Sequence, residues 1–263
     1  MDQTSINALH RNKTGKVSDK WASYLAYYDT LFGPLREQPL TMLEIGVQNG
    51  GSLETWSRYF KAGQRFIGCD IDPKCGTLQY EDQRISIVVG DANAAPTFQA
   101  IRAISADFDI VIDDGSHQSM DILNSFVNYF PLLKPGGLYV VEDAHTLYND
   151  AYGGGVLNEF GAYSLFKKLI DVVSFQFWRD ELSIKTYFRT FFPQTSTPGF
   201  ILDGWVDAIA FRNSVVTITK ALIPSHEKLG ERVLVGSSAQ VQTWGGSFKV
   251  ESVTATANAE AGQ

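Results

Sequence analysis

The stretch Phe108–His117 reads FDIVIDDGSH, and a second stretch, Gly137–His145, reads GLYVVEDAH. Each is an apolar run of strand length that ends in two carboxylates, with a histidine just beyond. In an open parallel sheet, ligands bind outside the carboxyl ends of the strands. If the two strands are neighbours, Asp114, Glu142 and Asp143 meet at that edge, where like charges need protons or a cation to offset them. A hard divalent metal ion is the simplest answer.

Outward from these two stretches, strand-length apolar runs alternate with helical patterns. The other predicted strands are 41–47, 65–71 and 85–89, and the predicted helices are 21–32, 53–63, 94–104, 120–133 and 163–178. Two final strands, 206–211 and 215–221, are separated by only three residues, which suits an antiparallel hairpin and no crossover helix. The pattern predicts an α/β fold with a doubly wound, mostly parallel seven-stranded sheet and a C-terminal antiparallel hairpin.

Composition excludes several classes of protein. The chain has 263 residues, 44% of them hydrophobic, a net charge of -7 and a pI of about 5.1. No basic block indicates nucleic-acid binding, and no apolar run has membrane-spanning length. The first 16 residues lack the apolar core of a secretory signal, and two isolated cysteines form neither a zinc site nor a disulfide framework. We expect a cytoplasmic protein with no nucleic-acid or membrane partner.

The same patterns predict the domain organisation. Residues 1–40 form an N-terminal helical segment, 41–222 the main domain, 223–250 a C-terminal extension with one further helix, and 251–263 a disordered tail. Residues 1–17 are expected to be partly ordered.

The first strong helical pattern begins after Ser18, a plausible N-cap, and runs from Trp21. One interpretation is a helix packed on the main domain. The other is a flap over the site, with Asp19 or Lys20 reaching in. Exposed aromatic residues on this helix would favour a homo-oligomer.

The turn after the first strand bears on the cofactor. Dinucleotide-binding folds need G-x-G-x-x-G so that backbone amides can approach a pyrophosphate. Here the pattern is Glu44-x-Gly46-x-x-x-Gly50, with Gln48 in place of the second glycine. This pattern argues against NAD.

S-adenosylmethionine carries no phosphate; it presents an ammonium group, ribose hydroxyls and an adenine amine. Acidic residues at successive strand ends suit these donors. Glu44 can face the methionine amino group, Asp70 can accept from the ribose hydroxyls, and Asp91 can accept from the adenine amine. The ordered set of three therefore favours S-adenosylmethionine over a dinucleotide.

The motifs that contain Glu44, Gly46, Gly50, Asp70 and Asp91 resemble those of class I S-adenosylmethionine-dependent methyltransferases. The final antiparallel hairpin is also typical of that Rossmann-like fold. The resemblance implies that these five residues bind the cofactor.

Three further motifs are SDKW at 18–21, DDGSH at 113–117 and VEDAHT at 141–146. They resemble bacterial metal-dependent sugar O-methyltransferases of the mycinamicin and macrocin type, with cephalosporin-hydroxylase-like relatives, over roughly residues 13–220. This resemblance implies that Asp114, Glu142 and Asp143 bind Mg²⁺ and that His117 is the general base. Its substrate would be a small-molecule glycoside of the deoxysugar or rhamnose type, in a natural product or a surface glycan.

Three other residues follow the second stretch and are candidate substrate contacts: His145, Tyr148 and Tyr152. The last two lie in the glycine-rich segment 146–155, a candidate lid. For each tyrosine, ordinary packing is the competing interpretation.

Three alternatives stay open. The first is a catechol-type O-methyltransferase, although such enzymes typically have Asn at the position of Asp143 and Lys near that of His117. The second is an NAD-binding oxidoreductase, and the third is a non-catalytic partner that binds S-adenosylmethionine. The intact carboxylates and His117 argue against the third, since a scaffold has no need of them.

Overall fold

The structure of the chain is a computed structural model, and it describes residues 3–179, 181–192, 197–233 and 235. The chain divides into one compact unit, Met1–His226, and a second unit that starts at Glu227. The N-terminal segment 1–40 therefore belongs to the same compact unit as the main domain.

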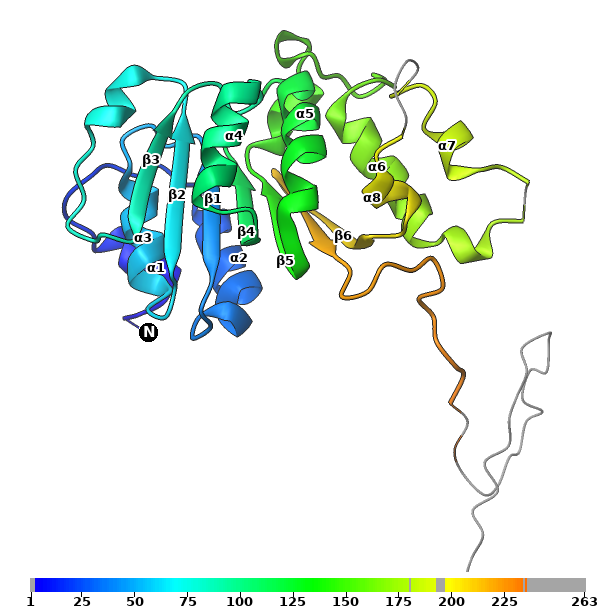
Figure 1. Cartoon of the computed structure of the whole chain (residues 1–263), viewed down its shortest axis with the longest axis horizontal. Coiled ribbons are helices and arrows are strands. Elements are labelled where there is room, and N and C mark those ends of the chain that lie inside the picture. The colour runs from blue at the N-terminus through cyan, green and yellow to red at the C-terminus, as the bar shows by residue number, and fades with distance from the viewer. Residues whose placement is uncertain (1–2, 180, 193–196, 234, 236–263) are drawn as a thin grey trace, which may run out of the picture. The chain divides into compact units, whose positions relative to one another are not determined.

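A seven-stranded sheet forms the centre of the first unit (Figure 1). Its strands are β1 (Thr41–Ile45), β2 (Arg65–Asp70), β3 (Ile85–Val89), β4 (Phe108–Asp113), β5 (Leu133–Val141), β6 (Val206–Arg212) and β7 (Val215–Lys220). Their order is β3-β2-β1-β4-β5-β7-β6. Strands β1 to β5 pair in parallel, whereas β7 pairs antiparallel with both β5 and β6. The predicted fold class is confirmed.

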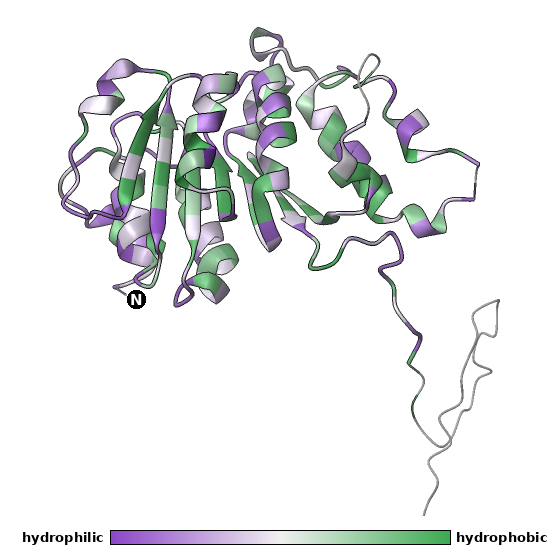
Figure 2. Ribbon diagram, viewed as in Figure 1, coloured by the Kyte–Doolittle hydropathy of each residue, from purple (hydrophilic) through white to green (hydrophobic). Residues whose placement is uncertain are grey.

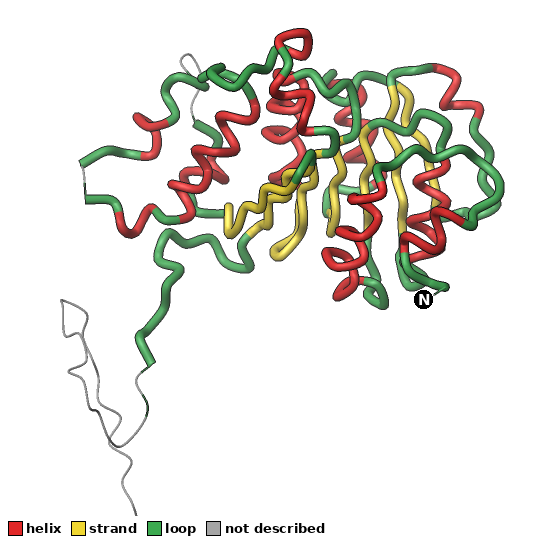
Figure 3. Tube along the Cα trace, turned by 180° about the vertical axis from the view of Figure 1, so that it is seen from behind, coloured by secondary structure: helices red, strands yellow, loops and turns green. Residues whose placement is uncertain are grey.

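Helices cover both faces of the sheet. The α-helices are α1 (Ile6–Arg11), α2 (Ala22–Phe32), α3 (Gly51–Tyr59), α4 (Ala95–Ile104), α5 (Ser119–Tyr129), α6 (Ala162–Val173), α7 (Ile184–Tyr187) and α8 (Gly199–Leu202). Short 3-10 turns are η1 (Gly33–Leu35), η2 (Pro73–Thr77), η3 (Phe130–Leu132), η4 (Ala144–Tyr148), η5 (Asp150–Tyr152) and η6 (Phe175–Phe177). Figure 1 shows α4 and α5 in front of the sheet, and Figure 3 shows the helices of the opposite face.

Alternation along the strands explains the two layers. Met42 and its neighbour Ile110 pack in the core that also contains residues of α1, α2 and α3. Leu43 and its neighbour Val111 point the other way, into the core formed with α4, α5 and α6. Because successive side chains of a strand point to opposite faces, a strand buried on both sides is expected to be mostly apolar. The strands in Figure 2 are accordingly mostly hydrophobic.

Three local predictions differ from the structure. Residues 1–17 include the helix α1, because Ser5 Oγ caps Ala8 N at 3.1 Å and Asp29 Oδ1 accepts from Ile6 N at 2.6 Å. Helix α5 ends at Tyr129, since Pro131 follows and cannot continue it. Helix α6 ends at Val173, five residues before the predicted end.

The C-terminal region is described only in part. Within residues 223–233 and 235 there is no helix or strand, and the rest of the predicted extension and tail lies outside the described residues. No helix in the described part of the chain is long and apolar enough to span a membrane.

Candidate active site

A cavity of about 1020 Å³ opens at the carboxyl ends of the parallel strands. It lies beside β1, which pairs with β2 on one side and β4 on the other, the point at which the strand order reverses. Ligands of doubly wound sheets bind at this switch point. Its walls include Asp70, Asp91, Asp114, His117 and Asp143, together with residues 17–21 of the N-terminal segment.

Two of the acids predicted to bind the cofactor lie along this cavity. Asp70 Oδ2 accepts from the backbone N of Val47 and Gln48, each at 2.8 Å, and its Oδ1 accepts from Asp72 N at 2.9 Å. Burial opposes ionisation, but these backbone donors hold the pKa of Asp70 below its usual value. Asp91 caps its own turn through Asn93 N at 2.9 Å. Both side chains are hydrogen-bond acceptors on the cavity wall.

The two glycines of the first turn have steric roles. Gly46 has a φ of 91°, and a Cβ there would lie 2.0 Å from the carbonyl oxygen of Asp114. Gly50 has a φ of 80°, and a Cβ there would lie 2.2 Å from the hydroxyl oxygen of Tyr80. Of these two glycines, Gly46 lines the cavity and Gly50 does not.

Glu44 lies behind the cavity wall. Its side chain is fully buried; Oε2 accepts from Ser52 Oγ at 2.7 Å, and Oε1 has no hydrogen-bond partner among the described residues. Burial raises the pKa of Glu44, and the ammonium of Lys20 opposes that shift. In the structure the Lys20 ammonium faces this carboxylate, 3.5 Å from Oε1. A direct contact of Glu44 with a cofactor amino group therefore stays a prediction.

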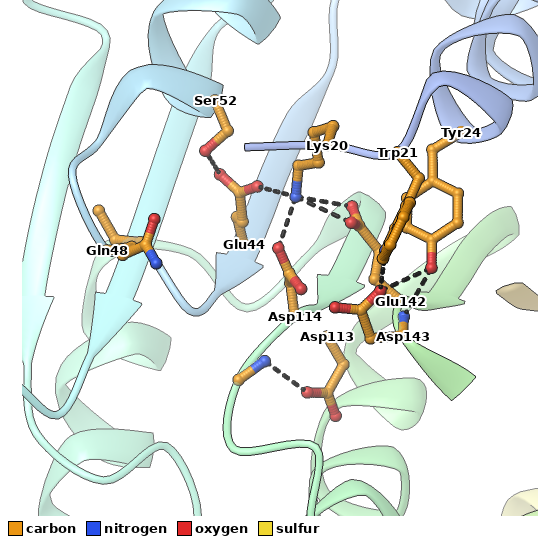
Figure 4. Close-up of polar contacts among 12 residues, drawn as sticks. Lys20, Trp21, Tyr24, Glu44, Gln48, Ser52, Asp113, Asp114, Glu142 and Asp143 are labelled. Carbon is orange, nitrogen blue, oxygen red and sulfur yellow. Dashed lines mark hydrogen bonds and ion pairs between the residues drawn. The ribbon is translucent and has the colours of Figure 1, made fainter. Parts of the chain in front are cut away.

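Lys20 is the centre of a group of carboxylates that we call the Lys20 cluster: Lys20, Glu44, Asp114 and Glu142 (Figure 4). Its Nζ lies 2.5 Å from Asp114 Oδ2, 2.9 Å from each carboxylate oxygen of Glu142 and 3.5 Å from Glu44 Oε1. The lysine side chain is 4% exposed. Of the two residues proposed to reach into the site from a flap, Lys20 does so and Asp19 is exposed.

The charge within the Lys20 cluster is unbalanced. Among the described residues, three carboxylates meet a single ammonium. Burial, followed by the charge of Asp114, raises the pKa of Glu142 even though Lys20 opposes the shift. Tyr28 of α2 donates to Glu142 Oε1 at 2.8 Å and supplies a further dipole. A divalent cation would satisfy this group better than a monovalent one does.

A second group shares Asp114 and lies nearer to solvent. Ligand atoms of Asp114, His117 and Asp143 all lie within 4.8 Å of one another, as do those of Glu44, Asp114 and Glu142. His117 Nε2 is 3.8 Å from Asp143 Oδ2. The predicted magnesium ligands therefore divide between two groups that meet at Asp114. Their joint role as a single metal site stays a prediction.

Asp143 is held from the N-terminal segment. Its Oδ1 accepts from Trp21 Nε1 at 3.0 Å and from the Tyr24 hydroxyl at 2.7 Å, while its Oδ2 faces His117. The Tyr24 hydroxyl also contacts Ser214 in the turn between β6 and β7, 3.0 Å from the carbonyl oxygen. One carboxylate oxygen is thereby fixed and the other is directed at the cavity.

Backbone strain is concentrated at this site. All four non-glycine residues with positive φ in the described part of the chain lie here: Gln48, His117, Asp143 and Ser214. Such conformations cost on the order of 1–3 kcal/mol each and persist where the surroundings impose them, as they do at functional sites.

The remaining predicted residues lie farther out. His145 Nδ1 is 2.6 Å from Ser214 Oγ, and its ring packs edge-on against Trp21. Tyr148 packs against Tyr163 of α6. None of His145, Tyr148 and Tyr152 is among the described residues that line the cavity. Their contact with a substrate stays a prediction.

Sequence reasoning missed the hydroxyl groups of Tyr24 and Tyr28 as partners of the carboxylates. Their positions on α2 were interpretable only as a packed helix face. The available signal was their spacing of four residues, which places both side chains on one face of α2, the helix that begins two residues after Lys20. It also missed Ser214, which lay in a turn with no motif.

Comparison with known proteins shows a similarity to methyltransferases. A family model described as a methyltransferase domain matches residues 43–144. The chain is 38% identical over 164 residues to 8-demethyl-8-alpha-L-rhamnosyl tetracenomycin-C 2'-O-methyltransferase of Streptomyces olivaceus, covering 59% of this chain and 42% of that enzyme. It is 39% identical over 163 residues to mycinamicin VI 2''-O-methyltransferase of Micromonospora griseorubida, covering 58% and 40%.

A solved methyltransferase structure is also similar to this chain. The MycE methyltransferase from the mycinamycin biosynthetic pathway, in complex with Mg, SAH and mycinamycin VI, superimposes with a TM-score of 0.64 at 30% identity. That match covers 84% of this chain and 54% of the other. The chain thus spans about half the length of the relatives it matches. Residues 43–144 thus match a methyltransferase domain, and the chain is similar in sequence to bacterial O-methyltransferases that act on glycosylated antibiotics.

Proposed function

We propose that this protein transfers a methyl group from S-adenosylmethionine to a hydroxyl group of a sugar, within a glycosylated natural product or a surface glycan, with Mg²⁺ as a second cofactor. One observation carries the proposal. A single cavity joins the acids at the ends of β2 and β3 to the carboxylates and His117 at the ends of β4 and β5. A donor site and an acceptor site are therefore continuous.

The donor half of the cavity suits S-adenosylmethionine. Asp70 and Asp91 are acceptors at successive strand ends, and Gly46 lets the first turn approach closely. When bound, the cofactor supplies a methyl group on a sulfonium centre, whose departure needs no acid. The chain's part is to bind and orient the donor, and to keep the acceptor oxygen in line with the methyl group.

The acceptor half suits a hard divalent cation. Its donors are carboxyl oxygens, Glu44 Oε1 lacks a hydrogen-bond partner among the described residues, and one ammonium faces three carboxyl groups in the Lys20 cluster. Asp114, Glu142 and Asp143 are the proposed magnesium ligands. When bound, Mg²⁺ supplies Lewis-acid chemistry that lowers the pKa of a substrate hydroxyl.

His117 is the proposed general base. Its Nε2 is 3.8 Å from Asp143 Oδ2, so the proton that it takes up would be stabilised by that carboxylate. Imidazole exchanges protons in the neutral pH range. Trp21 and Tyr24 hold the other oxygen of Asp143 and so fix the carboxylate that orients His117.

The substrate class follows from the relatives. They are described as enzymes acting on rhamnosyl tetracenomycin and mycinamicin VI, and we infer a deoxysugar glycoside here. A cytoplasmic location and a homo-oligomer also stay predictions.

The test is a methyl-transfer assay read by mass spectrometry, with rhamnosides and macrolide glycosides in one panel and catechols in another. We expect a mass gain of one methylene on glycosides only, dependent on Mg²⁺ and abolished in Asp114→Asn. The variant Glu54→Gln, which changes a carboxylate outside the cavity, is the matched control and retains turnover. Full activity in EDTA would exclude the metal, and methylation of catechols alone would replace the substrate class.

A further inference from the structure

Lys20 and a divalent cation need the same oxygen atoms. The Lys20 ammonium contacts both oxygens of Glu142 and Oδ2 of Asp114, all within 2.9 Å. A cation bound by Asp114 and Glu142 has to approach these oxygens at the short distances that magnesium requires, about 2.0–2.1 Å. Two cations so close together repel each other strongly in a buried site. We propose that Lys20 and the metal ion are alternative occupants of the carboxylate cluster, and that metal binding expels the Lys20 ammonium.

This inference rests on the proposed magnesium site and adds a role for Lys20. Without metal, the ammonium keeps the carboxylates together in the arrangement that the metal ion needs. Lys20 is thus a positioning residue, since it acts through the ligands and touches no reacting atom.

The segment that carries Lys20 can let the ammonium go. Residues 17–21 form no helix or strand. At the start of this segment, Val17 is anchored by its carbonyl oxygen, which accepts from Gly51 N at 3.0 Å. After them, α2 is fixed by the buried side chains of Leu25, Tyr28 and Phe32. Neither anchor depends on Lys20, so release of the ammonium leaves both ends of the segment in place.

A third anchor precedes the segment. We call Lys13, Lys16 and Glu54 the Glu54 cluster: Lys13 Nζ lies 3.0 Å from Glu54 Oε2, and Lys16 Nζ lies 3.1 Å from Oε1. This group lies outside the cavity walls. Its lysines therefore provide an internal reference for any change at Lys20.

Space for the released side chain exists on the cavity side. Lys20 itself is a wall residue of the cavity, as are Ser18, Asp19 and Trp21, and Trp21 is 60% exposed. Rotation of the lysine side chain about its own bonds brings the ammonium from the carboxylates into the cavity without unfolding α2.

The experiment measures the reactivity of lysines in the wild-type protein, without cofactor or substrate. The protein is treated with an amine-acetylating reagent with and without Mg²⁺, and acetylation is quantified by peptide mass spectrometry. We expect Lys20 to be nearly unreactive without metal, because it is 4% exposed, and at least fivefold more reactive with Mg²⁺. Lys16, 23% exposed, is the internal control and keeps its reactivity.

Calorimetric titration of Mg²⁺ into the same protein separates the possible failures. If Mg²⁺ binds and Lys20 stays unreactive, the displacement is wrong and Lys20 is a permanent counter-ion, while the proposed function stands. If Mg²⁺ does not bind at millimolar concentration, both the displacement and the metal role fall.

Mg²⁺ binding by a variant without the Lys20 ammonium is a second test of the displacement. Lys20→Met should bind Mg²⁺ at least tenfold more tightly than the wild type, because no internal cation competes, whereas Lys16→Met should match the wild type. Unchanged or weaker binding by Lys20→Met overturns the proposal. Should Lys20→Met fail to fold, the wild-type labelling experiment still decides.

Discussion

The lysines of two ionic clusters lie a few residues apart on the N-terminal segment, and the two clusters differ in the ratio of ammonium groups to carboxyl groups. In the Glu54 cluster, two ammonium groups serve one carboxylate. In the Lys20 cluster, one ammonium serves three carboxylates, two of them fully buried. The two lysines of the Glu54 cluster are partly exposed, so solvent can stabilise their excess positive charge and no further ion is needed. An excess of buried carboxyl groups favours a further ion, because burial raises the pKa of Glu44 and Glu142, and a cation would stabilise their ionised forms.

The clearest way to break this comparison is to neutralise one carboxylate in each cluster. Glu142→Gln removes a proposed metal ligand. Mutations of residues that only support metal ligands lower metal affinity by roughly 10- to 100-fold, so we expect the Mg²⁺ affinity of this variant to fall by more than about 100-fold. Glu54→Gln should leave the affinity unchanged. Calorimetry on both variants measures the difference, and equal losses would mean that the two clusters are equivalent.

A smaller effect is expected one contact away from the ligands. Tyr24→Phe removes the hydroxyl that holds Asp143 Oδ1 at 2.7 Å. Because such outer contacts orient metal ligands, we expect Mg²⁺ affinity to fall by roughly 10- to 100-fold. Tyr27→Phe, which loses a hydroxyl bonded to Thr217, is the control and should bind Mg²⁺ normally. A normal affinity in Tyr24→Phe would show that Asp143 needs no support.

Stability provides a third test. Tyr28→Phe leaves the buried Glu142 Oε1 without its 2.8 Å donor, and we expect a loss of about 1–3 kcal/mol in the free energy of unfolding. The ring stays, so its packing against Phe32 and Trp56 is retained. Denaturant titration without metal measures the loss. A neutral outcome would indicate that Lys20 alone satisfies Glu142.

The smallest effect concerns the Glu54 cluster and pH. Although burial opposes it, hydrogen bonds from Lys13 and Lys16 lower the pKa of Glu54 below its ordinary value of 4.5. A depressed acid pKa contributes stability that is present above the ordinary pKa and is lost as pH falls through the folded-state pKa. Wild type should therefore exceed Glu54→Gln by about 0.2–1 kcal/mol at neutral pH, and the gap should close below about pH 4.5. Unfolding curves at several pH values check this.

The sequence predicted those parts of the site that local pattern determines. Asp70, Asp91 and Asp114 follow apolar strand-length runs, and parallel strands bring their carboxyl ends to one edge. Length, alternation and a three-residue hairpin connection were also enough for the sheet. In each case the information lies within a few residues of the element that it describes.

Contacts across long sequence separations could not be predicted in the same way. Lys20 reaches Asp114 and Glu142 across 94 and 122 residues, and no local pattern selects Lys20 over Asp19. The tyrosines of α2 have apolar rings that fit a packed face, so their hydroxyl partners depend on how α2 is placed against β5. The turn residue Ser214 enters the site only because β7 pairs antiparallel with β5.

The contact between the Tyr24 hydroxyl and Ser214 joins residues 190 positions apart. A chain is synthesised from its N-terminus, and its domains fold in that direction. Tyr24 is made early, but its partner in the β6–β7 turn is nearly the last residue of the sheet to be added. A nascent chain that has completed β1 to β5 therefore has its acidic residues but not the hairpin that secures Tyr24 above Asp143. The site can therefore be fully assembled only after the β6–β7 hairpin has been synthesised.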